Sequence, residues 1–359
     1  MIKSNFVEKI FSLKNVELNG VYYKRLFCLG LTLKIKNPLL TISKNTSFTK
    51  ELLTQGFLKS EFEIERCNAF YEEMKSFDII NKYKALIKNL DKDSIEEISK
   101  ILGRVIKIAT SNTKLLDIFM PHEILKIQEV KKELEANLVK LSKNCYAYKD
   151  YFLPINHFES SVFYYKHNID SINQKNFSEK NIIDAGAYIG DSAIVLEKYT
   201  NKNVYSFEPT TENYNLLLET IALNNSTKII PIKSALGSCE EELEIYLQES
   251  GSSINRIINN APNKEIIKVT SLDKFIDENK LDVGLIKVDI EGFEQEFLKG
   301  AEKTIRTQKP TLLISIYHNA SDFFDIKPLL ESWNLGYKFK IKKPIDGGIR
   351  GEVLLIAEQ

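Results

Sequence analysis

The chain has 359 residues, in which 49 Lys and Arg balance 49 Asp and Glu, and 43% of its residues are hydrophobic. Zero net charge argues against a dedicated nucleic-acid binder, which usually carries a basic excess, and no apolar run reaches the length of a membrane span. Four cysteines without a C-x-x-C pair argue against a disulfide framework and favour the reducing cytoplasm. Met1 to Ile10 mixes charged and apolar residues, so we expect no signal peptide.

The first predicted element is a β-hairpin within Val21–Lys36. Leu31, Leu33 and Ile35 alternate with polar residues, which is strand periodicity, and Gly30 suits the turn. We expect the hairpin to pack on the protein's own helices. Because the segment is basic at its ends and apolar between them, the alternative is a patch that contacts a membrane surface or a partner enzyme.

Residues 46–144 follow a helical pattern. Ser94 to Glu97 has the form of a capping box in front of one apolar helix face, and Pro121 suits the first position of another helix. Apolar residues repeat at helical spacing as far as Leu141. We predict a mainly helical N-terminal domain over residues 1–145, which either contacts further copies of the chain in an oligomer or binds the acceptor.

Residues 146–180 are predicted to be an aromatic connector. Cys145–His167 is dense in Tyr and Phe and is interrupted by Pro154. We expect it to pack between domains, with His157 and His167 as structural hydrogen-bonding residues. The alternative is a strap over a ligand pocket, since aromatic faces suit sugar rings and attract cations.

The stretch 181–208 organises the rest of the chain, with the pattern strand, glycine turn, helix, strand and acid. The run that opens it is typical of a strand buried on both faces. Gly186 and Gly190 let the backbone approach a ligand, and a helix capped by Asp191 or Ser192 offers free N–H groups. This arrangement predicts a nucleoside-binding turn.

The charge of this turn favours a cofactor without phosphate. G-A-Y-I-G lacks the G-x-G-x-x-G pattern of a pyrophosphate site, and Asp184 and Asp191 would repel a pyrophosphate. Glu208, at the end of the next strand, can accept hydrogen bonds from both hydroxyls of a ribose. S-adenosylmethionine has a sulfonium, an ammonium and a ribose but no phosphate, and we predict it as the cofactor.

Among the strands predicted after the glycine turn, three are followed directly by candidate site residues. The strands and the residues that follow them are Lys228–Lys233 with Ser234 and Ala235, Val283–Val288 with Asp289, and Thr311–Tyr317 with His318. Ligand groups collect at the carboxyl ends of strands in an open parallel sheet. Pro231 indicates an edge strand. The polar loop Ser250–Arg256 is a candidate acceptor loop, with an ordinary surface loop as the alternative.

Asp289 opens a group of three acids with Glu291 and Glu294. Asp289 can face a ligand's ammonium or the acceptor, and the alternative for the group is capping of the helix that follows. A divalent metal on this group lacks support from histidine spacing, so no metal ligand is assigned and activity is expected to survive EDTA.

The motifs D-A-G-A-Y-I-G-D, F-E-P-T-T-E-N-Y and L-I-K-V-D-I-E-G-F-E with L-K-G-A occur in this order. From about Phe158 onward the chain therefore resembles the FkbM-type methyltransferases, which are S-adenosylmethionine-dependent O-methyltransferases of glycan and natural-product pathways. Tyr188 departs from the family, which often has Asn there. The resemblance implies an α/β fold with a Rossmann-like seven-stranded methyltransferase sheet over residues 181–359, preceded by the helical domain, and places Ser234 and Ala235 beside the adenine.

The predicted cofactor site comprises Asp184, Gly186, Ala187, Tyr188, Gly190, Asp191, Glu208, Ser234, Ala235 and Asp289. The predicted reaction is methyl transfer to a hydroxyl of a sugar or surface-glycan intermediate. His318 is the predicted general base, because it alone of the four histidines directly follows a central strand on the ligand edge. Asp289 is the second catalytic candidate, and Asp322 is a further rival for the base.

Two other classes of function stay open at this point. One is a nucleotide-sugar oxidoreductase on the same type of sheet, although its phosphate-binding glycine pattern is missing here. The other is a non-catalytic scaffold whose methyltransferase domain has decayed, although Gly186, Gly190 and Glu208 are present.

Overall fold

The computed structural model describes residues 11–18, 21–28, 31–36, 57–58, 61–76, 78–111, 115–116, 118–246 and 264–359. The candidate acceptor loop Ser250–Arg256, the hairpin turn at Gly30 and the segment Met1–Ile10 lie outside the described residues.

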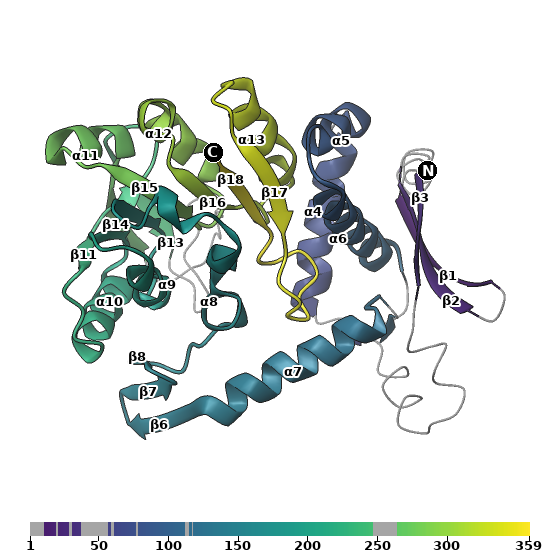
Figure 1. Cartoon of the computed structure of the whole chain (residues 1–359), viewed down its shortest axis with the longest axis horizontal. Helices are drawn as coiled ribbons and strands as arrows, with labels where there is room; N and C mark the ends of the chain where they lie inside the picture. Colours follow the sequence, from purple (N-terminus) through teal and green to yellow (C-terminus); the bar gives the residue numbers. More distant parts are fainter. Residues whose placement is uncertain are drawn as a thin grey trace.

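A seven-stranded sheet forms the centre of the molecule (Figure 1). In spatial order its strands are β11 (Ile229–Ile232), β10 (Val204–Phe207), β9 (Asn181–Ala185), β15 (Val283–Val288), β16 (Thr311–Ser315), β18 (Leu354–Glu358) and β17 (Lys338–Lys342). Neighbouring strands are parallel except at β18, which is antiparallel to both β16 and β17. The predicted methyltransferase sheet is confirmed, and β11 with Pro231 is an edge strand as expected.

Both faces of the sheet are covered, because successive strand residues belong to different apolar clusters. Ile183 and Ile286 pack in one cluster with α11 (Leu272–Asn279), α12 (Glu294–Gln308) and α13 (Ala320–Ser332). Ile182 and Leu285 pack in another with α9 (Asp191–Leu196), α10 (Thr211–Leu223) and the connector. The central strands β15 and β16 are buried at every position, as continuous apolar runs require.

A small side sheet extends from the main one after β11. It consists of β12 (Ala235–Leu236), β14 (Lys264–Thr270) and β13 (Glu241–Tyr246), with β14 in the middle.

The N-terminal region contains a three-stranded antiparallel sheet and helices. The sheet consists of β1 (Phe11–Leu18), β2 (Val21–Cys28) and β3 (Leu31–Lys36), and the helices are α4 (Glu61–Ser76), α5 (Ile79–Ile87), α6 (Lys92–Thr110) and α7 (Pro121–Asn137). The predicted hairpin is confirmed as β2 and β3, and β1 adds a third strand. Two-residue strands β4 (Phe57–Leu58) and β5 (Leu115–Leu116) pair with each other.

The cap of α6 differs from the prediction. Asp91 precedes the helix, and its Oδ1 accepts a hydrogen bond from Ser94 N at 2.7 Å. Ser94 therefore lies inside the first turn, and the predicted capping box from Ser94 to Glu97 is wrong. The Ser94 hydroxyl instead accepts a hydrogen bond from Ile341 N of β17 at 2.9 Å, which ties the helix to the main sheet.

The helical prediction is also wrong at the end of α7. Pro121 is the first helical residue as expected, but the helix ends at Asn137 and Leu138–Ser142 forms strand β6. Strands β6, β7 (Cys145–Tyr148) and β8 (Tyr151–Leu153) make an antiparallel sheet. The apolar periodicity misleads here because its last members have nothing to pack against: the Leu141 side chain is 56% exposed.

Helices α4 to α6 share a continuous buried core with α13 and β17. The rings of Phe70 and Phe323, for example, meet edge to face with centroids 5.7 Å apart. Figure 1 shows these helices beside α13 and β17, while α7 runs below the sheet to β6. The division into residues 1–145, 146–180 and 181–359 stays a prediction. Among the described residues, none of the helices combines the length and the apolar character needed to cross a bilayer.

Candidate active site

Three strand tips meet at one edge of the main sheet. Ala185, Phe207 and Val288 are aligned in the register of β9, β10 and β15, so the residues that follow them leave the sheet side by side. Gly186 touches the neighbouring turn so closely that a Cβ placed on it would lie 1.8 Å from the carbonyl oxygen of Asp289. Gly186 also has a φ of +79°, so this position requires glycine on both counts.

Glu208 holds the glycine turn in place through its carboxylate. It is 5% exposed; Oε2 accepts a hydrogen bond from Tyr188 N at 3.2 Å, and Oε1 accepts one from Thr210 N at 2.9 Å. Burial raises the pKa of Glu208, and the hydrogen bonds from Thr210, Asn213 and Tyr188 act against that rise. Because a carboxylate has about four acceptor positions, Oε2 can accept one more bond from a ligand.

Tyr188 has a backbone conformation that few tyrosines adopt. Its φ of +48° lies in the left-handed region, where Gly and Asn are favoured. The site therefore has an aromatic ring at this position, and the backbone of Tyr188 is strained. That ring meets His157 of the connector edge to face with centroids 5.0 Å apart, and His157 Nε2 lies 3.9 Å from Asp191 Oδ2.

The connector thus lies against the glycine turn at two points. The second contact joins His167 Nε2 to the Ser192 hydroxyl at 2.9 Å. His167 belongs to the 3-10 helix η2 (Lys166–Ser171), and burial lowers its pKa to about 3, so its ring is neutral. These contacts agree with the strap interpretation of the aromatic segment.

The cap of α9 is Gly190, with a φ of +86°, and Asp191 and Ser192 are the first helical residues. The prediction that Asp191 or Ser192 caps the helix is wrong. The helix continues only to Leu196, and a 3-10 turn, η4 (Glu197–Tyr199), follows. Burial raises the pKa of the Asp191 carboxyl.

Lys287 is a site residue that the sequence interpretation missed. Its Nζ lies 3.1 Å from Asp184 Oδ1 and donates to the carbonyl oxygen of Gly186 at 2.9 Å, and both side chains are at most 5% exposed. Burial raises the pKa of Asp184 to about 6 in spite of Lys287, so at neutral pH the two groups form an ion pair. Asp184 therefore supports the turn from within. The sequence feature that could have identified Lys287 is that it is the single charged residue in the otherwise apolar strand β15.

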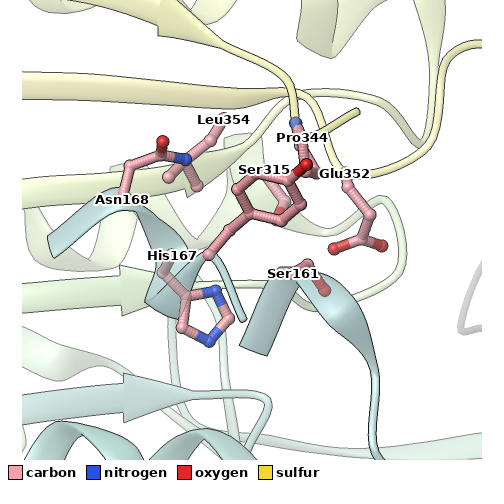
Figure 2. A pocket seen from close by; sticks show the side chains of 8 residues that line it. Ser161, His167, Asn168, Ser315, Pro344, Glu352 and Leu354 are labelled. Atoms are coloured by element: carbon pink, nitrogen blue, oxygen red, sulfur yellow. The ribbon is translucent and has the colours of Figure 1, made fainter. Parts of the chain in front are cut away.

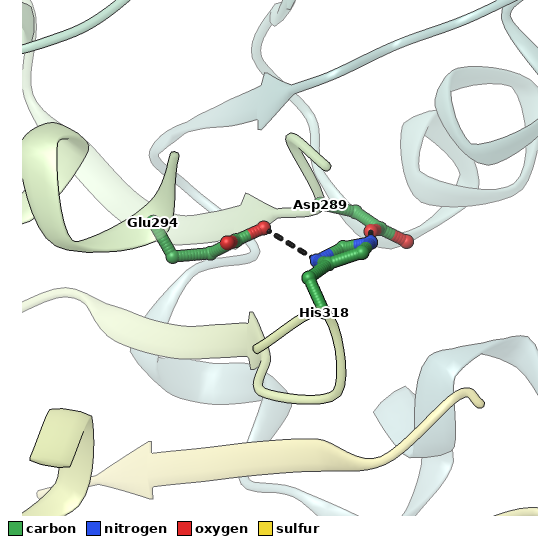
Figure 3. Close-up of side chains that lie close together, drawn as sticks. All are labelled: Asp289, Glu294 and His318. Carbon is green, nitrogen blue, oxygen red and sulfur yellow. Dashed lines mark ion pairs between the residues drawn. The ribbon is translucent and has the colours of Figure 1, made fainter. Parts of the chain in front are cut away.

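Figure 3 shows the most polar part of the edge, where Asp289, Glu294 and His318 meet. His318 Nδ1 is 3.0 Å from Glu294 Oε1, and His318 Nε2 is 3.5 Å from Asp289 Oδ1 and 3.6 Å from Glu291 Oε2. The His318 side chain is 5% exposed and that of Asp289 is 24% exposed. Asp289 is thus the member of this cluster that combines close packing with access to a ligand.

Burial and acidic neighbours together set the charge state of His318. Burial lowers its pKa, but the carboxylates of Glu294, Asp289 and Glu291 outweigh this effect and raise the pKa to about 9. At neutral pH the imidazole carries a proton and cannot accept another. The choice of His318 as general base took no account of these three acidic neighbours, and it stays a prediction.

Tyr317 and Asp322 flank this cluster. The Tyr317 hydroxyl donates to Asp289 Oδ1 and Oδ2 at 3.2 and 3.3 Å, a contact that no motif in the sequence predicts. Asp322 is 1% exposed and accepts hydrogen bonds from Gln295 and Asn319, both at 2.9 Å. Asp322 thus faces the protein interior, which weakens its case as a rival base.

Ser234 and Ala235 lie at the start of the side sheet and are 9% and 7% exposed. The Ser234 hydroxyl is 3.0 Å from the carbonyl oxygen of Ala235 and 3.1 Å from that of Lys268. Their contact with an adenine stays a prediction.

A small cavity lies where the connector meets the ends of β16 and β18 (Figure 2). Its lining is Ser161, Tyr165, His167, Asn168, Ser315, Pro344, Glu352 and Leu354. Burial, together with Asp289 and Glu159, raises the pKa of Glu352 to about 8, so this carboxyl is mostly protonated at neutral pH. The cavity lies away from Glu208 and contributes no residue of the predicted cofactor site.

The chain is similar to known methyltransferases. Residues 184–339 match the family model described as a methyltransferase FkbM domain. The crystal structure of a methyltransferase FkbM from Methylobacillus flagellatus KT shares the fold with a TM-score of 0.53 at 18% identity, over 82% of this chain and 62% of that one.

Two curated proteins are similar to part of the chain. Methyltransferase 1 of Beauveria bassiana is 23% identical over 186 residues, which are 45% of this chain and 74% of that protein. The hexuronic acid methyltransferase AglP of Haloferax volcanii is 26% identical over 153 residues, 42% of this chain and 62% of AglP. The match thus spans less than two thirds of AglP.

Proposed function

We propose, from the match of residues 184–339 to the methyltransferase FkbM domain, that the chain is a methyltransferase of the FkbM type and transfers a methyl group from S-adenosylmethionine to a hydroxyl of a sugar or surface-glycan intermediate. The observation that carries the proposal is the meeting of Gly186, Glu208 and Asp289 at one sheet edge. Glu208 would accept a ribose hydroxyl, and Asp289 would face the reacting groups. Ala187, Tyr188 and Gly190 complete the turn around the cofactor.

Methyl transfer depends mainly on placement, because the acceptor oxygen must attack in line with the S–CH₃ bond. That bond breaks, an O–CH₃ bond forms, and the electron pair stays on sulfur as a neutral thioether. The hydroxyl proton passes to the Asp289 carboxylate. In this scheme His318 is a positioning residue, since its proton attracts Asp289 while Tyr317 donates to the same carboxylate.

The sugar acceptor is supported by two features. Tyr188 brings a partly exposed aromatic ring to the glycine turn, and aromatic faces suit sugar rings. The printed name of AglP gives hexuronic acid as its methyl acceptor. We place the reaction in the cytoplasm, in keeping with the free thiols of Cys67, Cys145 and Cys239.

The protein is expected to bind S-adenosylmethionine and S-adenosylhomocysteine but not NAD. The glycine turn lacks the G-x-G-x-x-G pattern of a pyrophosphate site and is followed by the buried acid Asp191, whereas the charge of Asp184 is balanced by Lys287. Isothermal titration of the purified chain with all three ligands tests this. Tight binding of NAD would replace the methyltransferase proposal with the oxidoreductase alternative, and binding of none would favour the scaffold alternative.

Glu208→Ala is expected to weaken S-adenosylmethionine binding by about 1–3 kcal/mol, because it removes an acceptor for the ribose and leaves buried N–H groups without a partner. The measurement is calorimetric affinity at constant pH. Glu219→Ala, an exposed acid on α10, is the matched control and should keep the wild-type affinity. Equal affinities for both variants would remove Glu208 from the ribose role.

A further inference from the structure

Asp289, Glu294 and His318 come from three separate elements and converge on one point. Asp289 follows β15, Glu294 is the first residue of α12, and His318 follows β16. Each offers one ligand atom, and these atoms lie within 4.8 Å of one another. We propose that this centre binds one divalent cation through Asp289 Oδ1 and His318 Nε2, with a role in catalysis that rests on the methyl transfer proposed above.

The separation of the two ligand atoms fits a shared ion. His318 Nε2 and Asp289 Oδ1 are 3.5 Å apart. Two atoms that each lie about 2.1 Å from a metal are roughly 3.0–3.4 Å apart at octahedral or tetrahedral angles. Both ring nitrogens of His318 are buried, and within the described part of the chain neither one has a hydrogen-bond partner. Glu291 Oε2, 3.6 Å from the same nitrogen on a half-exposed side chain, offers a further carboxylate.

The other ring nitrogen, Nδ1, lies next to a carboxylate, the kind of partner that metal-binding histidines use. A ligating imidazole usually donates its second N–H to a carboxylate, which fixes the orientation of the ring. His318 Nδ1 is 3.0 Å from Glu294 Oε1, and that oxygen also accepts a hydrogen bond from Ile290 N at 3.0 Å. Glu294 is fully buried, so it is suited to hold the ring while Nε2 points toward Asp289.

The charge of the cluster also favours a dication. Asp289, Glu291 and Glu294 surround a single imidazole. Arg66 acts on Glu291, so Asp289 and Glu294 share the one charge of His318. The nearby Lys287 is already paired with Asp184. Imidazole nitrogen together with carboxylate oxygen suits ions such as Mn²⁺ or Zn²⁺.

An ion at this position would replace the His318 proton that attracts Asp289, since a ligating nitrogen must be deprotonated. It would lie beside the carboxylate that faces the acceptor. It could bind the acceptor oxygen as a Lewis acid and so assist loss of the hydroxyl proton. The bonds that break and form stay those given above, and the proton passes to the Asp289 oxygen that the ion leaves free. The expectation of activity without a metal, drawn from histidine spacing alone, is replaced by this proposal.

The test is titration of the EDTA-treated, dialysed full chain with Mn²⁺ and, separately, with Zn²⁺. Calorimetry is expected to give one ion per chain, and the electron paramagnetic resonance signal of Mn²⁺ should change on binding. Asp289→Asn should lower the affinity at least 10-fold, and Glu294→Gln should lower it about 10–100-fold. Glu302→Gln, a half-exposed acid on the same helix that pairs with Arg306, is the control and should bind as the wild type does.

No binding by the wild type, or equal binding by all variants, would overturn the metal site. Thermal unfolding of each variant identifies loss of structure, and Asp289→Asn, at a partly exposed position, keeps the test valid if Glu294→Gln does not fold. The affinity for S-adenosylmethionine is measured on the same samples. Cofactor binding without metal binding would reject only this inference, and metal binding without cofactor binding would reject the proposed function.

Discussion

Asp289→Asn is expected to lower kcat by about 10²–10⁴-fold, the usual contribution of a proton acceptor in the transition state. The substitution preserves the shape of the side chain and removes its negative charge. Asp289 is the partly exposed acid of the cluster and receives the Tyr317 hydroxyl, so it faces the acceptor without supporting a large part of the core. Turnover with a panel of sugar acceptors, followed by mass spectrometry for the added methylene, measures the effect.

The affinity for S-adenosylmethionine separates two of the roles proposed for Asp289, proton acceptor and ligand of the methionine ammonium, and the metal titration described above tests the third. A base loses turnover while cofactor affinity stays within a few-fold, whereas a ligand of the methionine ammonium loses affinity first. His318→Gln, made in parallel, tests the earlier choice of base, and His122→Ala on the exposed face of α7 is the control. Full turnover in Asp289→Asn together with loss in His318→Gln would return the role of base to His318.

Lys287→Met is expected to lower the free energy of unfolding by about 3–5 kcal/mol, the cost of removing one partner from a buried ion pair. Lys287 is enclosed by β9 and β15, and its loss would leave the fully buried Asp184 carboxylate unpaired and the Gly186 carbonyl without a donor. Urea unfolding followed by circular dichroism measures the change.

Two further variants check the cause of this loss. Asp184→Asn combined with Lys287→Met removes the unpaired charge and should recover part of the stability. Lys303→Met removes an exposed lysine that pairs with Asp277 and should change stability by less than about 0.5 kcal/mol. If Lys287→Met is as stable as Lys303→Met, the pair does not hold the turn together.

The elements that could be predicted are those whose signal is local. The buried strand before Gly186 has its own apolar run, and the edge strand β11 has Pro231, which cannot donate to a central ladder. The order of strands in the sheet is not local, and it followed from the family motifs. Within the site, Gly186 and Glu208 were predicted because turn geometry and strand ends dictate them.

The errors concern contacts that only the tertiary structure creates. The charge state of His318 depends on Glu294, which precedes it by a helix and a strand, and the pairing of Lys287 with Asp184 depends on the register of β15 with β9. Ser94 was placed by a capping motif and Leu141 by periodicity, but Asp91 caps the helix instead, and the segment with Leu141 pairs with β7 as a strand. A pattern within one element does not show which of two residues caps a helix, or whether a segment extends a helix or pairs as a strand.

The contact of Gly186 with the Asp289 carbonyl has a consequence for precision during the reaction. With no side chain between them, the loop that would carry the donor and the turn that carries the proton acceptor share one surface. A thermal displacement of the glycine turn is therefore transmitted to the Asp289 turn, so the two turns move together. Transfer along a straight S–C–O line depends on relative position alone. The two halves of the reaction centre can move with the molecule and still remain aligned with each other.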